Sequence, residues 1–350
     1  MKFKCLSSLF IALCLTSLIF AQNQVIGYFP YWAQYSQYRP ADIHFERISE
    51  IRYASLMPVS DGSLTWMDEM DAANFDSLSR EAAKHNIPFV AVIGGMDATE
   101  VFAAIAADES LRSTFAKAVV EWVNRYNLAG VELDWQGLVS DDTGKFSALF
   151  SEVKNALSGR SVGVAVYPAS ADAYGEVLKS ADFVTVFVGN QMSVDSATVR
   201  PNLSLSDVST AMNLFTEKGV NKVKLSVVIS LSGMSFSGAS GLGSSHQGAG
   251  SGNEGFLSYK DLMTRFETPD YKVSFDEISS SEVAVGNGET IVFSGIPSVK
   301  AISSWVKDNG FGGVALYDLS EDHPEAIVSL FVTAGQVLRP EVNYAPTKKK

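Results

Sequence analysis

The sequence predicts an α/β protein built as a (β/α)8 barrel, with a small α+β insertion between the seventh strand and the seventh helix. Three observations lead to this prediction. Short runs rich in β-branched residues recur eight times, amphipathic helical patterns lie between most of them, and one late interval is too long for a strand-to-helix loop. Doubly wound sheets share this alternation, but eight repeats favour closure into a barrel.

The predicted strands are short, largely apolar segments of the kind that a barrel buries on both faces. They lie at residues 25–29, 48–57, 89–95, 131–136, 162–167, 183–188, 223–231 and 313–319. Apolar residues with helical spacing predict helices at residues 72–85, 98–107, 111–126 and 145–157. A barrel of this kind carries its active site at the C-terminal ends of its strands, so polar residues at those ends are the candidates to examine.

The two ends of the chain are expected to lie outside the barrel. Residues 1–21 carry two lysines, then an apolar run and a final alanine, which is typical of a secretory signal peptide and too short to favour a retained membrane span. Residues 22–338 would then form the barrel of a secreted protein, periplasmic or extracellular, and residues 339–350 a frayed tail. Both cysteines fall within the leader, so we expect no disulfide.

The long interval is expected to form the insertion, at residues 232–295. Its first part, residues 235–255, is rich in Ser and Gly, a composition that favours a mobile loop at the site face. Its second part holds three short strand-like segments and a Gly-Asn-Gly turn signal, at residues 272–276, 282–285, 286–288 and 290–293. The pattern indicates a small β-rich wall beside the site.

Composition and spacing argue against several classes of partner. Lys plus Arg number 27 against 39 Asp plus Glu, a net charge of −12, which argues against nucleic-acid binding. The four histidines, His44, His85, His246 and His323, lack the spacing of a metal site. Residues 250–255 match a dinucleotide-binding glycine pattern, but no strand precedes them. We therefore expect neither a metal nor a cofactor.

The sequence GVELDWQ, which ends at Gln136, places three polar side chains on one face of the fourth strand. Side chains alternate with period two, so Glu132, Asp134 and Gln136 share a face and the apolar residues between them share the other. Acids inside a buried strand cost free energy unless they have partners, so this register predicts a solvated site at the strand end. An exposed face of an antiparallel strand is the alternative.

Five segments, in order, give the chain a resemblance to glycoside hydrolase family 18, which contains chitinases, endo-N-acetylglucosaminidases and chitinase-like lectins. They are GYFPYWAQY at 27–35, VIGG at 92–95, GVELDWQ at 130–136, KLSVVISLSGMSF at 224–236 and GGVALY at 312–317. The resemblance runs from about residue 25 to about residue 335. It implies a (β/α)8 barrel with an insertion after the seventh strand.

The resemblance also assigns roles on the fourth strand. The family motif reads Asp-x-x-Asp-x-Asp-x-Glu, and this chain has Ala129, Glu132, Asp134 and Gln136 at those places. In the family the final Glu is the general acid, the substrate's own N-acetyl group is the nucleophile, and the preceding Asp orients that group. Gln136 has nearly the shape of Glu but no transferable proton, so we expect it to bind a sugar oxygen without acting as an acid.

Two further strands depart from the family pattern. Its Met-x-Tyr-Asp on the sixth strand appears as Phe-Val-Gly-Asn, so Gly189 stands where a Tyr would hold the acetamido carbonyl, and Asn190 follows. On the eighth strand Tyr317 replaces the Trp that floors the site. The resemblance implies that Tyr28, Trp32 and Tyr317 stack on sugar rings and that Asn190 forms hydrogen bonds to the sugar.

Three functions remain open from the sequence. The first is a pseudoenzyme that binds an oligosaccharide or polysaccharide containing N-acetylglucosamine, such as chitin. The second is an active hydrolase whose acid is Glu132, Asp134 or a loop residue, although Glu132 lies roughly 13 Å of strand below Gln136 at about 3.3 Å per residue. The third is a scaffold or inhibitor that works through the insertion.

Asp97 and Asp322 follow strand ends, but we expect them to cap helices.

Overall fold

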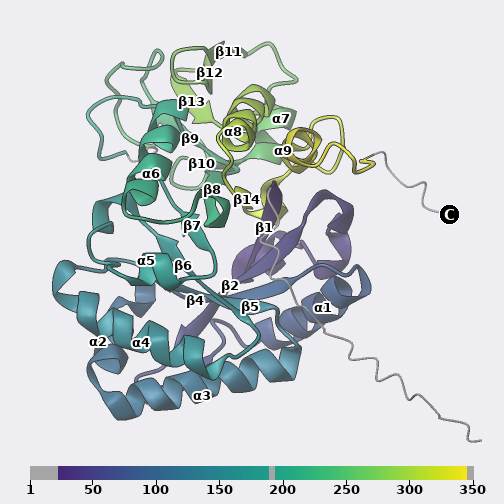
Figure 1. The fold of residues 1–350 in the computed structure, drawn as a ribbon. Coiled ribbons are helices and arrows are strands. Elements are labelled where there is room, and N and C mark those ends of the chain that lie inside the picture. Colours follow the sequence, from purple (N-terminus) through teal and green to yellow (C-terminus); the bar gives the residue numbers. More distant parts are fainter. Residues whose placement is uncertain (1–22, 189–193, 345–350) are drawn as a thin grey trace, which may run out of the picture.

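The computed structural model describes residues 23–188 and 194–344 (Figure 1). Within these residues, eight parallel strands form a closed barrel, because the first strand pairs with both the second and the last. The strands are β1 (Gln24–Pro30), β2 (Glu50–Pro58), β4 (Phe89–Gly95), β5 (Gly130–Trp135), β6 (Ser161–Val166), β7 (Val184–Val186), β8 (Leu225–Ser230) and β14 (Gly313–Tyr317). The predicted barrel is confirmed.

Helices lie around the outside of the barrel (Figure 1). They are α1 (Asp71–Lys84), α2 (Thr99–Ala107), α3 (Glu109–Tyr126), α4 (Thr143–Ala156), α5 (Val177–Ser180), α6 (Leu205–Glu217), α8 (Ile296–Asp308) and α9 (Leu330–Leu338). The connection from β1 to β2 holds three short 3-10 helices in place of an α-helix: η1 (Tyr31–Ser36), η2 (Pro40–Asp42) and η3 (Phe45–Arg47). A short antiparallel strand, β3 (Leu64–Thr65), pairs with the end of β2.

The two faces of β5 separate as the alternation predicted. Trp135 faces outward, where its ring centroid lies 5.5 Å from that of Phe102 on α2 and 5.7 Å from that of Phe146 on α4. Glu132 and Asp134 face the barrel interior and are 0% and 7% exposed. The apolar face therefore fixes the strand to the helices, while the polar face lines the inside of the barrel.

The insertion lies between β8 and α8 and is an antiparallel sheet, as predicted. Its strands run in the order β10-β9-β13-β12-β11. The elements are β9 (Ser232–Ser237), β10 (Phe256–Ser258), α7 (Tyr259–Arg265), β11 (Tyr271–Asp276), β12 (Ser281–Gly286) and β13 (Glu289–Phe293). Asn287 and Gly288 connect β12 to β13 with φ of 50° and 76°, the left-handed conformations that a tight hairpin turn requires.

The Ser- and Gly-rich segment of the insertion is anchored, which differs from the expected mobile loop. It begins with β9, and later Ser251 donates hydrogen bonds to Glu289 from its backbone N–H (2.8 Å) and its hydroxyl (2.7 Å). Ser235 donates to the same carboxylate at 2.6 Å. The Ser and Gly content could not reveal this anchoring, because Glu289 lies on β13, 38 residues after Ser251.

The chain folds back after α9. Tyr344 is 8% exposed, and its hydroxyl donates to the backbone carbonyl of Arg339 at 3.2 Å. Its ring lies so close to Gly335 that a Cβ there would come within 2.3 Å of the Tyr344 hydroxyl oxygen. The expectation of a frayed tail is therefore wrong for residues 339–344.

The predicted leader, and the tail beyond residue 344, lie outside the described residues. None of the described helices has both the length and the apolar character needed to cross a membrane.

Candidate functional site

A cavity of about 500 Å³ lies at the C-terminal ends of the barrel strands. We call it the mouth cavity. Glu132, Asp134 and Gln136 all line it, as the alternation along β5 predicted. Two aromatic side chains line it as well: Trp32, on η1 after β1, and Tyr317, the last residue of β14.

The floor of the mouth cavity is a buried ion pair. Arg52, on β2, is 1% exposed, and its Nη1 donates to Glu132 Oε1 at 2.7 Å. Tyr28 donates its hydroxyl proton to Glu132 Oε2 at 2.7 Å, and Arg52 Nε donates to Glu50 at 2.7 Å. Both oxygens of Glu132 are therefore occupied by protein donors. A role for Glu132 as an acid stays a prediction, and it would require breaking this pair.

Asp134 lies above the floor with a hydrogen bond to each oxygen. Tyr167, directly after β6, donates to Oδ1 at 3.0 Å, and Gln136 donates from Nε2 to Oδ2 at 3.1 Å. Burial raises the pKa of Asp134 to about 6, and the charge of Glu132 adds to this effect, while the two hydrogen bonds oppose it. Asp134 is thus a carboxyl group that changes charge in mildly acidic solution.

Tyr167 is a site residue that the sequence analysis missed. It is the last residue of the predicted fifth strand, and it lines the mouth cavity beside Asp134. Its position at the C-terminal end of a predicted strand could have indicated it, because the C-terminal ends of neighbouring parallel strands come together at one rim of a barrel.

Asp97 also lines the mouth cavity, which corrects the expectation that it caps a helix. The helix after it, α2, has Ala98 before its first residue and no side-chain cap. Gly95 pairs with Trp135 in the β4–β5 register, and Thr99 donates to the backbone carbonyl of Gln136 at 2.7 Å. These contacts hold an exposed carboxylate at the rim next to Gln136. Sequence alone could not separate a capping aspartate from a site aspartate here.

The other aspartate behaves as expected. Asp322 accepts a hydrogen bond from the backbone N–H of Leu330, the first residue of α9, at 2.8 Å. It satisfies one of the amide groups that a helix start leaves without a partner.

The aromatic candidates take different positions. Trp32 is 38% exposed, and its indole N–H donates to Asp318 Oδ2 at 3.2 Å. Its ring centroid lies 6.0 Å from that of Tyr317. Tyr28 is 1% exposed, with its ring 5.1 Å from Tyr317, so it offers little surface to a sugar. Stacking by these residues stays a prediction, and Asn190 lies outside the described residues.

The described residues contain no group of three or more His, Cys, Asp or Glu side chains that could hold a metal ion. The polar and aromatic side chains that line the mouth cavity include carboxyl, amide, phenol and indole groups. Groups of these kinds, set in a cleft, donate and accept hydrogen bonds and offer ring faces to a polar ligand.

A closed parallel barrel with an antiparallel insertion after its seventh strand, and with a polar and aromatic cavity at the C-terminal strand ends, places the chain among (β/α)8-barrel proteins. Comparison with known families then identifies the family within this fold. A sequence model of glycosyl hydrolases family 18 matches residues 24–322, and the chain belongs to this family.

Individual relatives are distant in sequence. The chain is 22% identical over 260 residues to the chitinase-like mite allergen Der p 18.0101 of Dermatophagoides pteronyssinus, covering 68% of this chain and 56% of that protein. Its fold is similar to that of catalytic domain 2 of the Ostrinia furnacalis Group II chitinase, with a TM-score of 0.84, 19% identity, and coverage of 91% and 96% of the two chains. A double mutant of a Cycas revoluta family 18 chitinase, in complex with (GlcNAc)4, aligns with a TM-score of 0.81, 20% identity, and coverage of 90% and 99%.

Proposed function

We propose that this chain is a secreted family 18 protein that binds N-acetylglucosamine oligomers in the mouth cavity without hydrolysing them at the family's usual rate. One observation carries the proposal: Gln136, at the position that the family motif gives to the general acid, places an amide beside Asp134. An amide has no proton to transfer near neutral pH. General acid catalysis contributes about 10² to 10⁴ in rate, so its loss would separate binding from cleavage.

The rest of the mouth cavity supports sugar binding. Trp32 exposes ring surface beside Tyr317, which suits the apolar faces of pyranose rings. Asp97 adds an exposed carboxylate at the rim that can accept hydrogen bonds from sugar hydroxyl groups. The Cycas revoluta mutant that crystallised with (GlcNAc)4 also carries a Glu-to-Gln substitution, which fits oligomer binding by a family 18 barrel with an amide in place of an acid.

A second candidate is a hydrolase that uses Asp134 as its acid. The raised pKa of Asp134, about 6, supports this candidate because part of the population is protonated near neutral pH. Its geometry favours the binding proposal, since both oxygens of Asp134 already accept hydrogen bonds from Tyr167 and Gln136.

Secretion is part of the proposal and rests on residues 1–21. Their lysines, apolar run and final alanine match a leader that an export system would remove. Expression of the full chain in a secreting host, with N-terminal sequencing of the exported protein, tests this. A new N-terminus near residue 22 is expected, and retention of an intact leader in the cell would contradict secretion.

The central experiment compares the mature chain with Gln136→Glu. Binding of (GlcNAc)4 is measured by calorimetry, and release of shorter oligomers by chromatography over several days. We expect the wild type to bind without cleavage. In Gln136→Glu two carboxyl groups would share a site near 3 Å, which raises the pKa of one of them and restores an acid. The variant should therefore cleave slowly.

Gln136→Met is the matched control, because it keeps a long side chain but can neither donate nor accept as an amide does. It should bind more weakly than the wild type and show no cleavage. Cleavage by the wild type would overturn the binding-only proposal. If Asp134→Asn abolished that cleavage, Asp134 would be the acid. Absence of binding by every form would reject the N-acetylglucosamine ligand.

A further inference from the structure

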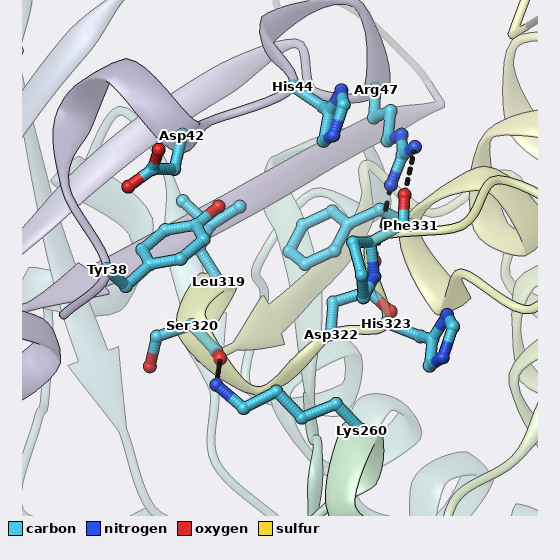
Figure 2. A pocket seen from close by; sticks show the side chains of 11 residues that line it. Tyr38, Asp42, His44, Arg47, Lys260, Leu319, Ser320, Asp322, His323 and Phe331 are labelled. Carbon is cyan, nitrogen blue, oxygen red and sulfur yellow. Dashed lines mark hydrogen bonds and ion pairs between the residues drawn. The ribbon is translucent and has the colours of Figure 1, made fainter. Parts of the chain in front are cut away.

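A second cavity, of about 230 Å³, lies beside the barrel and apart from the mouth cavity. We call it the side cavity. It is formed where the β1–β2 connection, the segment after β14, α7 and α9 come together, and Figure 2 shows its lining side chains. The absence of an α-helix between β1 and β2 leaves the room for it, because η2 and η3 are thin elements with little bulk.

Arg47 is a buried cation at this cavity with a donor left over. Its side chain is 7% exposed. Nη2 donates to the backbone carbonyl of Pro324 at 2.9 Å, and Nη1 lies 4.0 Å from Asp322. Nε is buried and has no hydrogen-bond partner among the described residues, with the Glu46 carboxylate 3.9 Å away. A buried guanidinium N–H without an acceptor costs free energy that an incoming acceptor would recover.

Three other side chains at the side cavity have donors to spare. Lys260 donates one of its three N–H groups to the backbone carbonyl of Ser320 at 2.7 Å. His323 accepts at Nδ1 from the backbone N–H of Glu325 at 3.2 Å, so its neutral ring carries the proton on Nε2. Burial, aided by nearby aspartates, holds the pKa of Tyr38 well above its usual range, so this phenol stays a donor.

The acidic side chains at the same cavity are already engaged. Asp322 accepts from the Ser329 hydroxyl at 2.5 Å and from the Leu330 backbone N–H at 2.8 Å. Asp42 accepts from the backbone N–H of Arg39 at 2.9 Å and from its Nε at 3.3 Å. These carboxylates are directed to partners of their own, and the buried Nε of Arg47 still lacks an acceptor, which suits a ligand that carries acceptors.

One wall of the side cavity is apolar. Leu319 and Phe331 line it, and Figure 2 shows the Phe331 ring between Tyr38 and the Arg47 side chain. A small inorganic ion would leave this wall uncovered, whereas a ligand with a carbon skeleton would bury it.

We propose that the side cavity binds a small organic anion, a carboxylate or phosphate monoester. Its acceptor atoms take hydrogen bonds from donors on different sides of the cavity, Arg47, Lys260 and His323, and its carbon skeleton lies on Leu319 and Phe331. This site is independent of the sugar-binding proposal, because it shares none of the side chains that line the mouth cavity.

Calorimetry on the mature chain tests the site with four probes: 3-phenylpropionate, phenyl phosphate, inorganic phosphate and the neutral 3-phenylpropionamide. We expect one organic anion to bind per chain, and the neutral amide to bind at least about tenfold more weakly, since hydrogen bonds to charged groups are the stronger ones. The two phenyl anions distinguish a carboxylate from a phosphate ligand. Binding of inorganic phosphate alone would overturn the organic ligand, and saturable binding by none of the anions would overturn the site.

Variants locate the binding. Lys260→Gln should lower the affinity for the organic anion by about tenfold. Lys300→Gln, which changes an exposed lysine on α8, should leave this affinity unchanged. Arg47→Lys should also lower this affinity, because an ammonium group cannot replace the several fixed N–H donors of a guanidinium. If Arg47→Lys fails to fold, Lys260→Gln and His323→Gln decide the question. Equal affinity in all variants would place the anion elsewhere. Binding of (GlcNAc)4 should be the same in all of them.

Discussion

The mouth cavity and the side cavity belong to one barrel but acquire their polar groups in opposite ways. Glu132 and Asp134 reach the mouth from alternate positions of β5, and Gln136 continues the alternation directly after the strand. Arg47 and Lys260 reach the side cavity from two segments more than 200 residues apart. The mouth presents carboxyl and amide groups, and the side cavity presents donors. Strand periodicity therefore builds one site, and the packing of helical segments that are remote in the sequence builds the other.

Within the mouth cavity, depth brings a second contrast. The floor acid, Glu132, is fully buried against Arg52, whereas Gln136 and Asp97 at the rim remain partly or largely open to solvent. We therefore expect substitutions at the floor to change folding stability and substitutions at the rim to change ligand binding.

The largest effect is expected at the floor. Arg52→Met removes the cation and leaves Glu132 buried without its partner, which should cost about 3–5 kcal/mol of the free energy of unfolding. Urea denaturation measures it. The double variant Arg52→Met with Glu132→Leu should recover part of the loss, because an apolar pair can replace a buried ion pair, although Glu50 and Tyr28 would still lose a hydrogen-bond partner each. A single variant as stable as the wild type would show that the pair is not structural.

Asp134 should make folding stability depend on pH. Its folded pKa of about 6 lies above the ordinary value of 3.8, so the stability tied to its protonated form is full below about pH 3.8 and is lost as pH rises through 6. As the pH rises from 4 to 7, the free energy of unfolding of Asp134→Asn should therefore increase relative to that of the wild type, by on the order of 3 kcal/mol. Urea denaturation at four pH values tests this, and parallel curves for the two proteins would contradict the raised pKa.

Trp32 should matter for the ligand and little for the fold. Trp32→Ala removes exposed ring surface at the mouth, so affinity for (GlcNAc)4 should fall about tenfold while the free energy of unfolding changes little. Tyr35→Ala is the matched control, because Tyr35 is 60% exposed on the same 3-10 helix and does not line the cavity. Equal losses in both variants would show that the effect is not stacking.

The smallest effect is expected at Asp97. Asp97→Asn keeps the shape of the side chain and exchanges a charged acceptor for a neutral one at an exposed rim. Affinity for (GlcNAc)4 should fall by a factor of about 2 to 10, because one hydrogen bond contributes about 0.5–1.5 kcal/mol. Asp76→Asn, on the exposed face of α1, should leave calorimetric affinity unchanged. Tighter binding by Asp97→Asn would mean that the carboxylate repels the ligand.

Much of the fold and part of the mouth could be predicted from the sequence. The eight strands and the four named helices were found by local periodicity, and the shared face of Glu132, Asp134 and Gln136 followed from the pleat. Tyr167 was missed although its strand was found, because nothing local indicates that its hydroxyl meets Asp134. Asp97 was misjudged for the same reason.

Local sequence patterns were enough to find the strands and helices and the face to which Glu132 and Asp134 point, because backbone geometry relates residues only two to four positions apart. The number of alternating strands and helices then favoured a barrel. Tertiary structure alone decided which groups meet. Closure of the barrel pairs Arg52 with Glu132 across 80 residues, and folding of the insertion brings Lys260 to Ser320 across 60. Such contacts depend on distances of a few ångströms between remote segments, and no local pattern encodes those distances.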